Sequence, residues 1–278
     1  MSADAAVEQQ AIAQPAATPV VVFDRVAIGF NGKQVLDGIS FTVAPGETRV
    51  ILGPAGCGKS VLLKLANGLL KPDSGTITIF GEEISHMHER QIYPLRARVG
   101  MVFQESALFD SLTVRDNVAY RLQEEKVASD EIEKRVQEAL SFVELEHTVD
   151  KFPAELSGGM RRRVAIARAI INKPDLLLYD SPTGGLDPIT STTIVELIVK
   201  QRDVFHTTSL LVTHRIQDAF TLATNEYDLK QGKMVPLPNN SLEASTRFLV
   251  LNEGRVVFDG STQELVRSED PWVREYLS

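Results

Sequence analysis

Apolar residues along the chain fall into short runs whose spacing alternates between strand-like and helix-like. Runs with the length and β-branched content of strands lie at residues 20–30, 41–44, 48–53, 75–81, 98–104, 175–180 and 209–214. Apolar residues three and four apart, typical of helices, lie at residues 59–70, 113–148, 156–171 and 189–202. Because strands alternate with helices, the pattern predicts a largely parallel sheet covered by helices on both faces.

Four segments depart from this alternation. Residues 105–172 are almost wholly helical in pattern, which predicts an inserted helical subdomain in which Ser129 caps a helix. Residues 225–247 are polar, and we expect a surface insertion there rather than a partner contact. Residues 248–260 predict a hairpin that leads into a short capped helix. The Ala- and Gln-rich residues 1–18 predict a flexible tail.

Composition narrows the class of protein. With 43% hydrophobic and 24% charged residues and no long apolar run, the chain fits a soluble globular protein rather than a membrane span. Its first residues lack the pattern of a secretory signal, so we expect a cytoplasmic location. The net charge of −8 and the lack of a dense basic block argue against nucleic acid as the main partner. The single cysteine, Cys57, excludes an internal disulfide, and a tolerated small residue is expected there rather than a redox sensor.

One motif predicts phosphate binding. The segment "GPAGCGKS", residues 53–60, matches G-x-x-x-x-G-K-[ST] between a predicted strand and a predicted helix. Its glycines allow backbone N–H groups to face phosphate oxygens, and the positive end of the helix points to the same place. Lys59 is expected to reach the β- and γ-phosphates, and Ser60 to ligate Mg²⁺. The expected nucleotide contacts are Gly53, Pro54, Ala55, Gly56, Cys57, Gly58, Lys59, Ser60 and Val61.

A second motif supplies a carboxylate. Asp180 ends the apolar run "LLLYD" about 120 residues after the glycine loop, the usual arrangement for the magnesium-directed carboxylate of such enzymes. Many buried strands end in Asp, so Asp180 indicates a magnesium site only in combination with the loop at 53–60.

Further motifs carry a resemblance to a known family. The segment "LSGGMRRRVAIARA", residues 156–169, resembles the signature motif of ATP-binding cassette (ABC) ATPases. The family's other motifs follow in order across about residues 20–265: an adenine-stacking aromatic at Phe30, the Q-loop at Gln104, the D-loop at 184–187 and the switch histidine at His214. A core role for Phe30, and roles as ordinary polar strand ends for Gln104 and His214, are the alternatives.

The resemblance implies a P-loop NTPase fold with a mostly parallel core sheet, an N-terminal antiparallel β-subdomain and an inserted α-helical subdomain. It implies an ABC domain over residues 19–265, followed by a C-terminal tail at 266–278. It also implies a head-to-tail homodimer with ATP and Mg²⁺ between the glycine loop of one copy and Ser157, Gly158 and Gly159 of the other. Gln104, Asp180, Ser181 and His214 form the implied catalytic set, with Gln104 also directed at the metal beside Ser60 and Asp180.

Within the family the chain resembles the ATPases of Mla/Mce-type lipid transporters, through "GMVFQESALFDSLTVRDNVAYRL" (100–122), Met160 and the ending "EDPWVREYLS". This implies docking on an integral membrane permease at the inner face of the membrane, with a Mce-type lipid-binding component in the complex. Phe103, Leu108 and Phe109 are candidates for apolar contacts with the permease, and core packing is expected for at least one. In the tail, Trp272 and Tyr276 are spaced to share a helix face, which packs on the dimer mate or on its own domain.

The sequence departs from the family after Asp180. The family places Glu there to orient or deprotonate the attacking water, and this chain has Ser181. Three interpretations stay open: slower hydrolysis with His214 and the serine hydroxyl orienting water, a carboxylate supplied by Glu105, or an ATP-driven clamp with little turnover. A solvated loop position is the simpler reading of Glu105.

Overall fold

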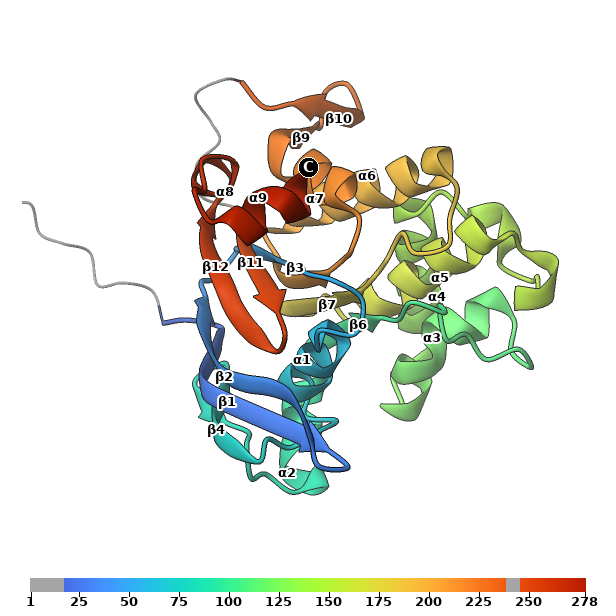
Figure 1. Cartoon of the computed structure of the whole chain (residues 1–278). Helices are drawn as coiled ribbons and strands as arrows, with labels where there is room; N and C mark the ends of the chain where they lie inside the picture. The colour runs from blue at the N-terminus through green and yellow to red at the C-terminus, as the bar shows by residue number, and fades with distance from the viewer. Residues whose placement is uncertain (1–17, 239–245) are drawn as a thin grey trace, which may run out of the picture.

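The computed structural model describes residues 18–238 and 246–278, and a six-stranded sheet lies at its centre (Figure 1). The strand order is β12-β11-β3-β8-β7-β6, in which β12 is antiparallel to β11 and every other neighbouring pair is parallel. The strands are β3 (Thr48–Leu52), β6 (Val99–Val102), β7 (Leu176–Asp180), β8 (Thr208–Val212), β11 (Thr246–Asn252) and β12 (Arg255–Ser261). The mostly parallel core predicted from the alternating pattern is confirmed.

Alternate residues of the buried strands enter two different hydrophobic cores. On β3, Val50 and Leu52 pack into one core and Ile51 packs into the other, because successive side chains of a strand point to opposite faces. The same alternation runs along β7 and β8. The central strands are therefore apolar on both faces, as parallel strands covered by helices require.

Helices cover both faces of this sheet. In Figure 1, α1 (Lys59–Ala66) lies on one side, and α6 (Pro188–Phe205), α7 (Ile216–Thr224) and α9 (Pro271–Leu277) lie on the other. A short helix, α8 (Thr262–Val266), follows β12 and begins with the predicted capping box, in which Ser261 and Glu264 exchange hydrogen bonds. The expected hairpin at residues 248–260 and its capped helix are confirmed.

A second, antiparallel sheet precedes the core in sequence. Its order is β2-β1-β4-β5, with β1 (Val21–Phe30), β2 (Lys33–Val43), β4 (Ser74–Ile79) and β5 (Glu82–Glu83). The rings of Phe23 and Phe41 stack between β1 and β2, with centroids 4.8 Å apart. This sheet and α2 (Glu89–Arg96) close the second core over α1. The N-terminal antiparallel sheet that the resemblance implied is present.

The helical subdomain is built mainly from α3 (Val114–Glu124), α4 (Ser129–Phe142) and α5 (Gly158–Ile170), with short 3₁₀ turns at Glu146–Thr148 and Pro153–Glu155. These helices lie at the right of Figure 1. The cap predicted for α4 was wrong: Ser129 is the first helical residue, and Ala128, with extended ψ, is the N-cap without a side-chain hydrogen bond. The first turn of α4 carries Asp130 and Glu131, which favour a helix start electrostatically without a capping hydroxyl.

Three further elements differ from the sequence pattern. Helix α1 ends at Ala66 rather than near residue 70, because Gly68 takes a left-handed φ of 61° just after it. Part of the polar stretch 225–247 forms a hairpin of β9 (Asn225–Asp228) and β10 (Lys233–Pro236), while residues 239–245 lie outside the described residues. The C-terminal tail expected from residue 266 contains α9, and the tail expected at 1–18 lies almost wholly outside them.

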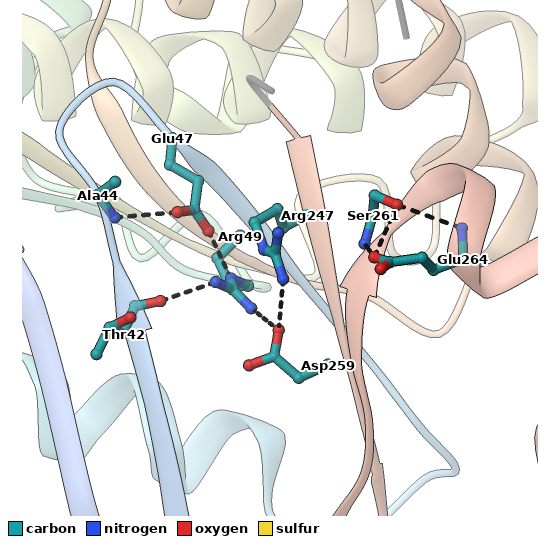
Figure 2. A network of polar contacts seen from close by, with 8 residues as sticks. All are labelled: Thr42, Ala44, Glu47, Arg49, Arg247, Asp259, Ser261 and Glu264. Atoms are coloured by element: carbon teal, nitrogen blue, oxygen red, sulfur yellow. Dashed lines mark hydrogen bonds and ion pairs between the residues drawn. The ribbon is translucent and has the colours of Figure 1, made fainter. Parts of the chain in front are cut away.

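An ion network centred on the buried Arg49 ties the two sheets together (Figure 2). Arg49 on β3 is 3% exposed; its Nε donates to Glu47 at 2.6 Å, and a second nitrogen pairs with Asp259 on β12. Its third donor reaches the carbonyl oxygen of Thr42 on β2 at 2.8 Å. Arg247 contacts Asp259 from β11 at 3.6 Å. The guanidinium therefore spans both sheets with its charge compensated by carboxylates.

Candidate functional site

The glycine loop lies between β3 and α1, and its backbone leaves no room for larger residues at two positions. Gly53 and Gly58 have φ of 149° and 102°, where residues with a Cβ are strained. A Cβ at Gly53 would lie 2.4 Å from the carbonyl oxygen of Leu251, and one at Gly58 would lie 2.5 Å from Leu36 Cδ2. The tight loop is thus fixed by its neighbours on β11 and β2 as well as by its own sequence.

The side chain of Lys59 closes the loop from inside. Its Nζ donates to the carbonyl oxygens of Gly53 and Pro54, both at 2.7 Å, and the residue is 8% exposed. Cys57 Sγ lies 3.7 Å from the same ammonium. The loop therefore holds a buried positive charge whose partners are neutral carbonyls, a suitable place for a phosphate.

The residues suited to a magnesium ion adjoin this charge. Ser60 Oγ donates to Asp180 Oδ1 at 3.0 Å, which joins the first turn of α1 to the end of β7. Asp180 is 8% exposed. A hydroxyl and one carboxylate match the donor set of Mg²⁺, which takes oxygen ligands and usually one or two from protein, the rest coming from phosphate and water.

A cavity of about 410 Å³ opens in front of these groups. It is lined by Val35, Ala55, Gly56, Gly58, Lys59, Ser60, Val61, Gln104, Ser181, Val212 and His214. Predicted residues from four separate motifs, namely the glycine loop, Gln104, Ser181 and His214, therefore meet in one space, since the carboxyl ends of parallel strands share one edge of the sheet. A second cavity of about 480 Å³ lies at the opposite edge, near Thr208 and Asp175, and none of the predicted site residues lines it. We assign the nucleotide site to the first cavity on this ground.

Ser181 occupies a constrained turn at the end of β7. Its φ is 46°, in the left-handed region, and its N–H donates to the carbonyl oxygen of Val212 at 2.8 Å. Its own carbonyl oxygen accepts from Gly184 N at 2.9 Å and from Arg162 Nη1 at 3.0 Å. The residue in the place of the family's glutamate is thus held through its main chain on both sides.

The Ser-Gly-Gly segment before α5 lies apart from this cavity. Ser157 is the N-cap of α5, and its side chain accepts from Met160 N at 3.2 Å. Gly158 is exposed, whereas Gly159 is buried so closely that a Cβ there would lie 2.3 Å from Thr190 Cγ2. None of the three lines the 410 Å³ cavity, so one chain presents the loop and this helix start as two separate surfaces.

The segment after Ser181 is braced by polar contacts. Asp187 caps α6 and accepts from the hydroxyl and the N–H of Thr190, which lowers the pKa of its carboxyl group. Thr183 donates to Asp218, which also pairs with Arg215 at 3.1 Å. Arg215 directly follows His214, which is exposed and lines the cavity. These contacts fix the turn around the histidine without using its ring.

Other predicted residues lie away from the cavity. Phe30 ends β1 at 43% exposure, and neither it nor the exposed Glu105 lines the 410 Å³ space. Leu108 packs against the main core, as expected for one of the three apolar candidates, while Phe109 is 43% exposed and packs on Tyr120.

Comparison with known proteins identifies the family. A family model described as ABC transporter matches residues 36–184, more than half of the chain. The chain belongs to the ABC ATPase family. The family match spans the phosphate loop, the Gln104 segment, the signature, Asp180 and Ser181.

Several named proteins are similar to this one. It is 37% identical over 224 residues to the methionine import ATP-binding protein MetN of Bifidobacterium longum, covering 78% of this chain and 56% of that protein. It is 38% identical over 259 residues to TRIGALACTOSYLDIACYLGLYCEROL 3 of Arabidopsis thaliana, covering 90% and 70%. It is 36% identical over 244 residues to MlaF, the intermembrane phospholipid transport ATP-binding protein of Escherichia coli K12, covering 87% and 82%.

A solved ABC cassette has the same fold. The cassette MJ0796, dimeric in a post-hydrolysis state bound to ADP and Pi, superposes with a TM-score of 0.72 at 28% identity, covering 87% of this chain and 98% of its own. In the described part of this chain, no helix is long and apolar enough to cross a membrane.

Two residues of this ABC site escaped the sequence motifs. Arg162 reaches three main-chain carbonyls around the cavity, and Tyr276 accepts from Gly53 N at 3.1 Å. Arg162 carried no clear signal, because the run Arg161–Arg163 does not show from sequence which arginine turns inward. Tyr276 carried none for this contact, since 223 residues separate it from Gly53. Its stacking on Trp272, at 5.3 Å, and the packing of both rings against the main core place the C-terminal helix on its own domain.

Proposed function

We propose that this chain is the ATP-hydrolysing subunit of a membrane ABC transporter that moves phospholipid or a related lipid between bacterial membranes. The observation that carries the ATPase assignment is the single cavity lined by Lys59, Ser60, Gln104, Ser181 and His214. Asp180 adjoins it through Ser60.

In this proposal the loop residues bind and orient the phosphates of ATP. Lys59 exchanges its loop carbonyls for β- and γ-phosphate oxygens, while the N–H groups of the loop and the start of α1 complete the cradle. Ser60, Asp180 and Gln104 hold Mg²⁺, which supplies charge neutralisation when bound. His214 lines the same cavity, and in this proposal it contacts the terminal phosphate. Phe30 stacks on adenine from the exposed end of β1.

The second half of each site comes from another copy of the chain. Ser157, Gly158 and Gly159 form a capped helix start whose N–H groups and dipole favour an anion. Because this surface lies outside the chain's own cavity, a head-to-tail homodimer would place it against the terminal phosphate bound by the other copy. Similarity to a cassette that is dimeric with ADP and Pi supports this arrangement.

The lipid assignment is supported by the names and coverage of two relatives. MlaF is named for phospholipid transport and TRIGALACTOSYLDIACYLGLYCEROL 3 for a glycerolipid, and both align with about nine-tenths of this chain. Methionine is the competing cargo, through MetN. The expected complex contains a membrane permease and a Mce-type lipid-binding component, with this subunit on the cytoplasmic face. Co-purification and mass spectrometry should find lipid enriched in the complex; methionine-dependent stimulation without bound lipid would reverse the assignment.

Hydrolysis must proceed without a glutamate at residue 181. Loss of a positioned general base costs roughly 10²–10⁴ in rate, yet positioning and charge neutralisation by the remaining groups still lower the barrier. Slow hydrolysis aided by His214 and the Ser181 hydroxyl is therefore our proposal. The exposure of Glu105 outside the cavity disfavours a relocated carboxylate. A clamp that binds ATP with little turnover is the alternative.

The test is Ser181→Glu, with Ser181→Gln as a control of similar size that lacks a carboxylate. We expect Ser181→Glu to raise the ATPase kcat by roughly tenfold or more, since it restores a base worth about 10²–10⁴, and Ser181→Gln to leave kcat low. Phosphate release per bound ATP measures the effect. If Ser181→Glu gives no gain and Glu105→Gln abolishes the ATPase rate, Glu105 supplies the carboxylate. If only His214→Ala abolishes the rate, His214 is the group that orients the water. ATP-dependent dimerisation without phosphate release would establish the clamp.

A further inference from the structure

Arg162 is a buried cation in the second turn of α5 that has no carboxylate partner among the described residues. The residue is 4% exposed and takes part in none of the ion pairs of the described chain. Burial lowers the pKa of its guanidinium, while the nearby charges of Glu105 and Asp180 act in the opposite direction. Its Nε has no hydrogen-bond partner within residues 18–238 and 246–278. Burial of an ion carries a desolvation penalty in free energy, so we expect a specific role for this arginine.

All of its hydrogen bonds go to main-chain carbonyls around the nucleotide cavity. Nη1 donates to Ser181 at 3.0 Å, and Nη2 donates to Gln104 and, at 3.5 Å, to Gly184. These carbonyls belong to the loop after β6, the turn after β7 and the start of the D-loop. Only a planar guanidinium has enough donors in one plane to serve three diverging segments at once.

Two of the three segments carry side chains that line the cavity, namely Gln104 and Ser181. Their arrangement is close: a Cβ on Gly184 would lie 3.1 Å from the Ser181 carbonyl oxygen and 3.6 Å from Gln104 Cγ. A change in the position of the guanidinium therefore changes the place of both residues together.

The start of the same helix lies only a few residues before Arg162. Helix α5 begins at Gly158 with Ser157 as its cap, and Arg162 follows within about 8 Å along a helix axis that rises about 1.5 Å per residue. In the proposed head-to-tail dimer, this helix start would meet ATP held by the partner subunit. Helix α5 is thus a short rigid link between the partner's ATP and the chain's own Gln104 and Ser181.

We propose that Arg162 is the positioning residue that couples the two ATP sites of the dimer. When the terminal phosphate of one site draws in the start of α5, the guanidinium moves the Gln104 loop and the Ser181 turn of the other site into their working places. Each site then favours occupation of the other, which is cooperativity in the strict sense of a coupling free energy. This inference rests on the proposed dimeric ATPase function.

A second arginine on α5 separates this role from simple support of the loop. Arg168 donates to the carbonyl oxygens of Ser106 at 2.9 Å and Ala107 at 2.7 Å, and it does not reach Ser181 or Gly184. Arg163, next to Arg162, donates to Val143 at the end of α4 at 3.0 Å and touches neither loop. Substitution of Arg168 therefore tests the loop after Gln104 alone, and substitution of Arg163 tests helix α5 alone.

The experiment measures ATPase rate against ATP concentration for the full-length protein and for Arg162→Gln, Arg162→Lys, Arg163→Gln and Arg168→Gln. We expect a wild-type Hill coefficient above 1, limited to about 2 by the two sites. In Arg162→Gln the coefficient should fall to about 1 and kcat should fall roughly tenfold or more, with less than about threefold change in ATP affinity of the isolated chain. Arg162→Lys keeps the charge but not the fork, so it should restore folding stability without restoring the coefficient.

The controls decide among the outcomes. Arg163→Gln should retain both kcat and the Hill coefficient, and Arg168→Gln should lower kcat while retaining the coefficient. A folded Arg162 variant with wild-type cooperativity, or equal loss of cooperativity in Arg163→Gln, would overturn the coupling. If the wild type binds ATP without hydrolysing it, the proposed ATPase function fails instead. In that case the coupling is measured as the steepness of dimer formation against ATP concentration in sedimentation. Among the variants, only Arg162→Gln should make this dependence less steep.

Discussion

Two arginines of this protein are buried almost equally, yet their surroundings are opposite. Arg49 is 3% exposed and lies between Glu47 and Asp259, with a third donor on a carbonyl of the antiparallel sheet (Figure 2). Arg162 is 4% exposed and contacts only the carbonyls of Ser181, Gln104 and Gly184. One guanidinium is paired with carboxylates, and the other is hydrogen-bonded to neutral main-chain carbonyls beside the nucleotide cavity.

The difference separates a structural charge from a functional one. A buried cation between carboxylates adds little net field around it, so its value lies in fixing the two sheets relative to each other. A buried cation held by carbonyls keeps its field and orients main-chain segments that carry Gln104 and Ser181. An anionic nucleotide would meet this field, because the guanidinium touches residues that line the same cavity. Burial alone does not distinguish the two roles, whereas the chemistry of the partners does.

The largest expected effect on stability comes from Arg49→Met. This change leaves Glu47, 6% exposed, as a buried carboxylate without its cation, and removal of one partner of a buried pair costs about 3–5 kcal/mol. Urea unfolding with a fixed m-value would measure the loss. ATP affinity of the folded fraction should stay near the wild-type value, because none of the network residues lines the nucleotide cavity.

Arg255→Met is the matched control for Arg49→Met. Arg255 also bridges β12 to β2, through Asp37 at 2.7 Å, but its side chain is 72% exposed. An exposed pair contributes less than about 1 kcal/mol, so the control should unfold close to the wild type. Equal losses in the two variants would show that the carboxylates do not set the strength of the Arg49 network.

A smaller effect is expected from Gly159→Ala, which displaces the helix that carries Arg162. The added Cβ would lie 2.3 Å from Thr190 Cγ2 on α6, so α5 or α6 must shift. Such overpacking costs about 1–3 kcal/mol, offset in part by the helix preference for Ala of up to about 1 kcal/mol. Urea unfolding should show the loss, and the ATPase assay should show lower kcat because Arg162 moves with the helix.

Gly158→Ala is the control, since its Cβ would meet its nearest neighbour, Leu186 Cδ2, at an ordinary 3.6 Å. We expect unchanged or slightly higher stability in this variant. A loss of stability in Gly158→Ala as large as that in Gly159→Ala would contradict the assignment of the cost to Thr190.

The motif residues of the nucleotide cavity were predictable from the sequence, whereas the contacts of these two arginines were not. The loop at 53–60 was predictable because its glycines, Lys59 and Ser60 are contiguous, so local backbone geometry brings them together. Gln104, Asp180 and His214 each follow a parallel strand, and strand ends of one sheet edge converge whatever the connections between them. The meeting of these residues in one cavity therefore follows from patterns that a sequence displays.

Long-range side-chain contacts had no such signal. The run Arg161–Arg163 suggests a solvated basic face, and only packing against the strands turns Arg162 inward while its neighbours hold other carbonyls. The pairing of Arg49 with Asp259 joins residues 210 apart in the chain. The hairpin β9-β10 lay hidden in a polar stretch because it is only partly buried and shows no regular alternation. These features depend on tertiary packing, which overrides local pattern.

The smallest effect is expected from Tyr276→Phe, which tests whether a neutral contact can substitute for a charged one. Tyr276 on α9 accepts from Gly53 N at 3.1 Å, so it positions the main chain of the phosphate loop much as Arg162 positions the Ser181 turn, but without charge. Loss of one neutral hydrogen bond costs about 0.5–1.5 kcal/mol, and the stacking of the ring on Trp272 survives the change. Urea unfolding should show this small loss, and titration with a fluorescent ATP analogue should show less than about tenfold weaker binding, since about 1.4 kcal/mol corresponds to tenfold. Tyr276→Leu, which also removes the stacking, should lose more stability with the same small change in affinity. A tenfold loss of affinity in Tyr276→Phe would mean that a neutral hydrogen bond positions the phosphate loop as firmly as the buried Arg162 positions the Ser181 turn. The difference between Arg49 and Arg162 would then lie in their position rather than in the charge of their partners.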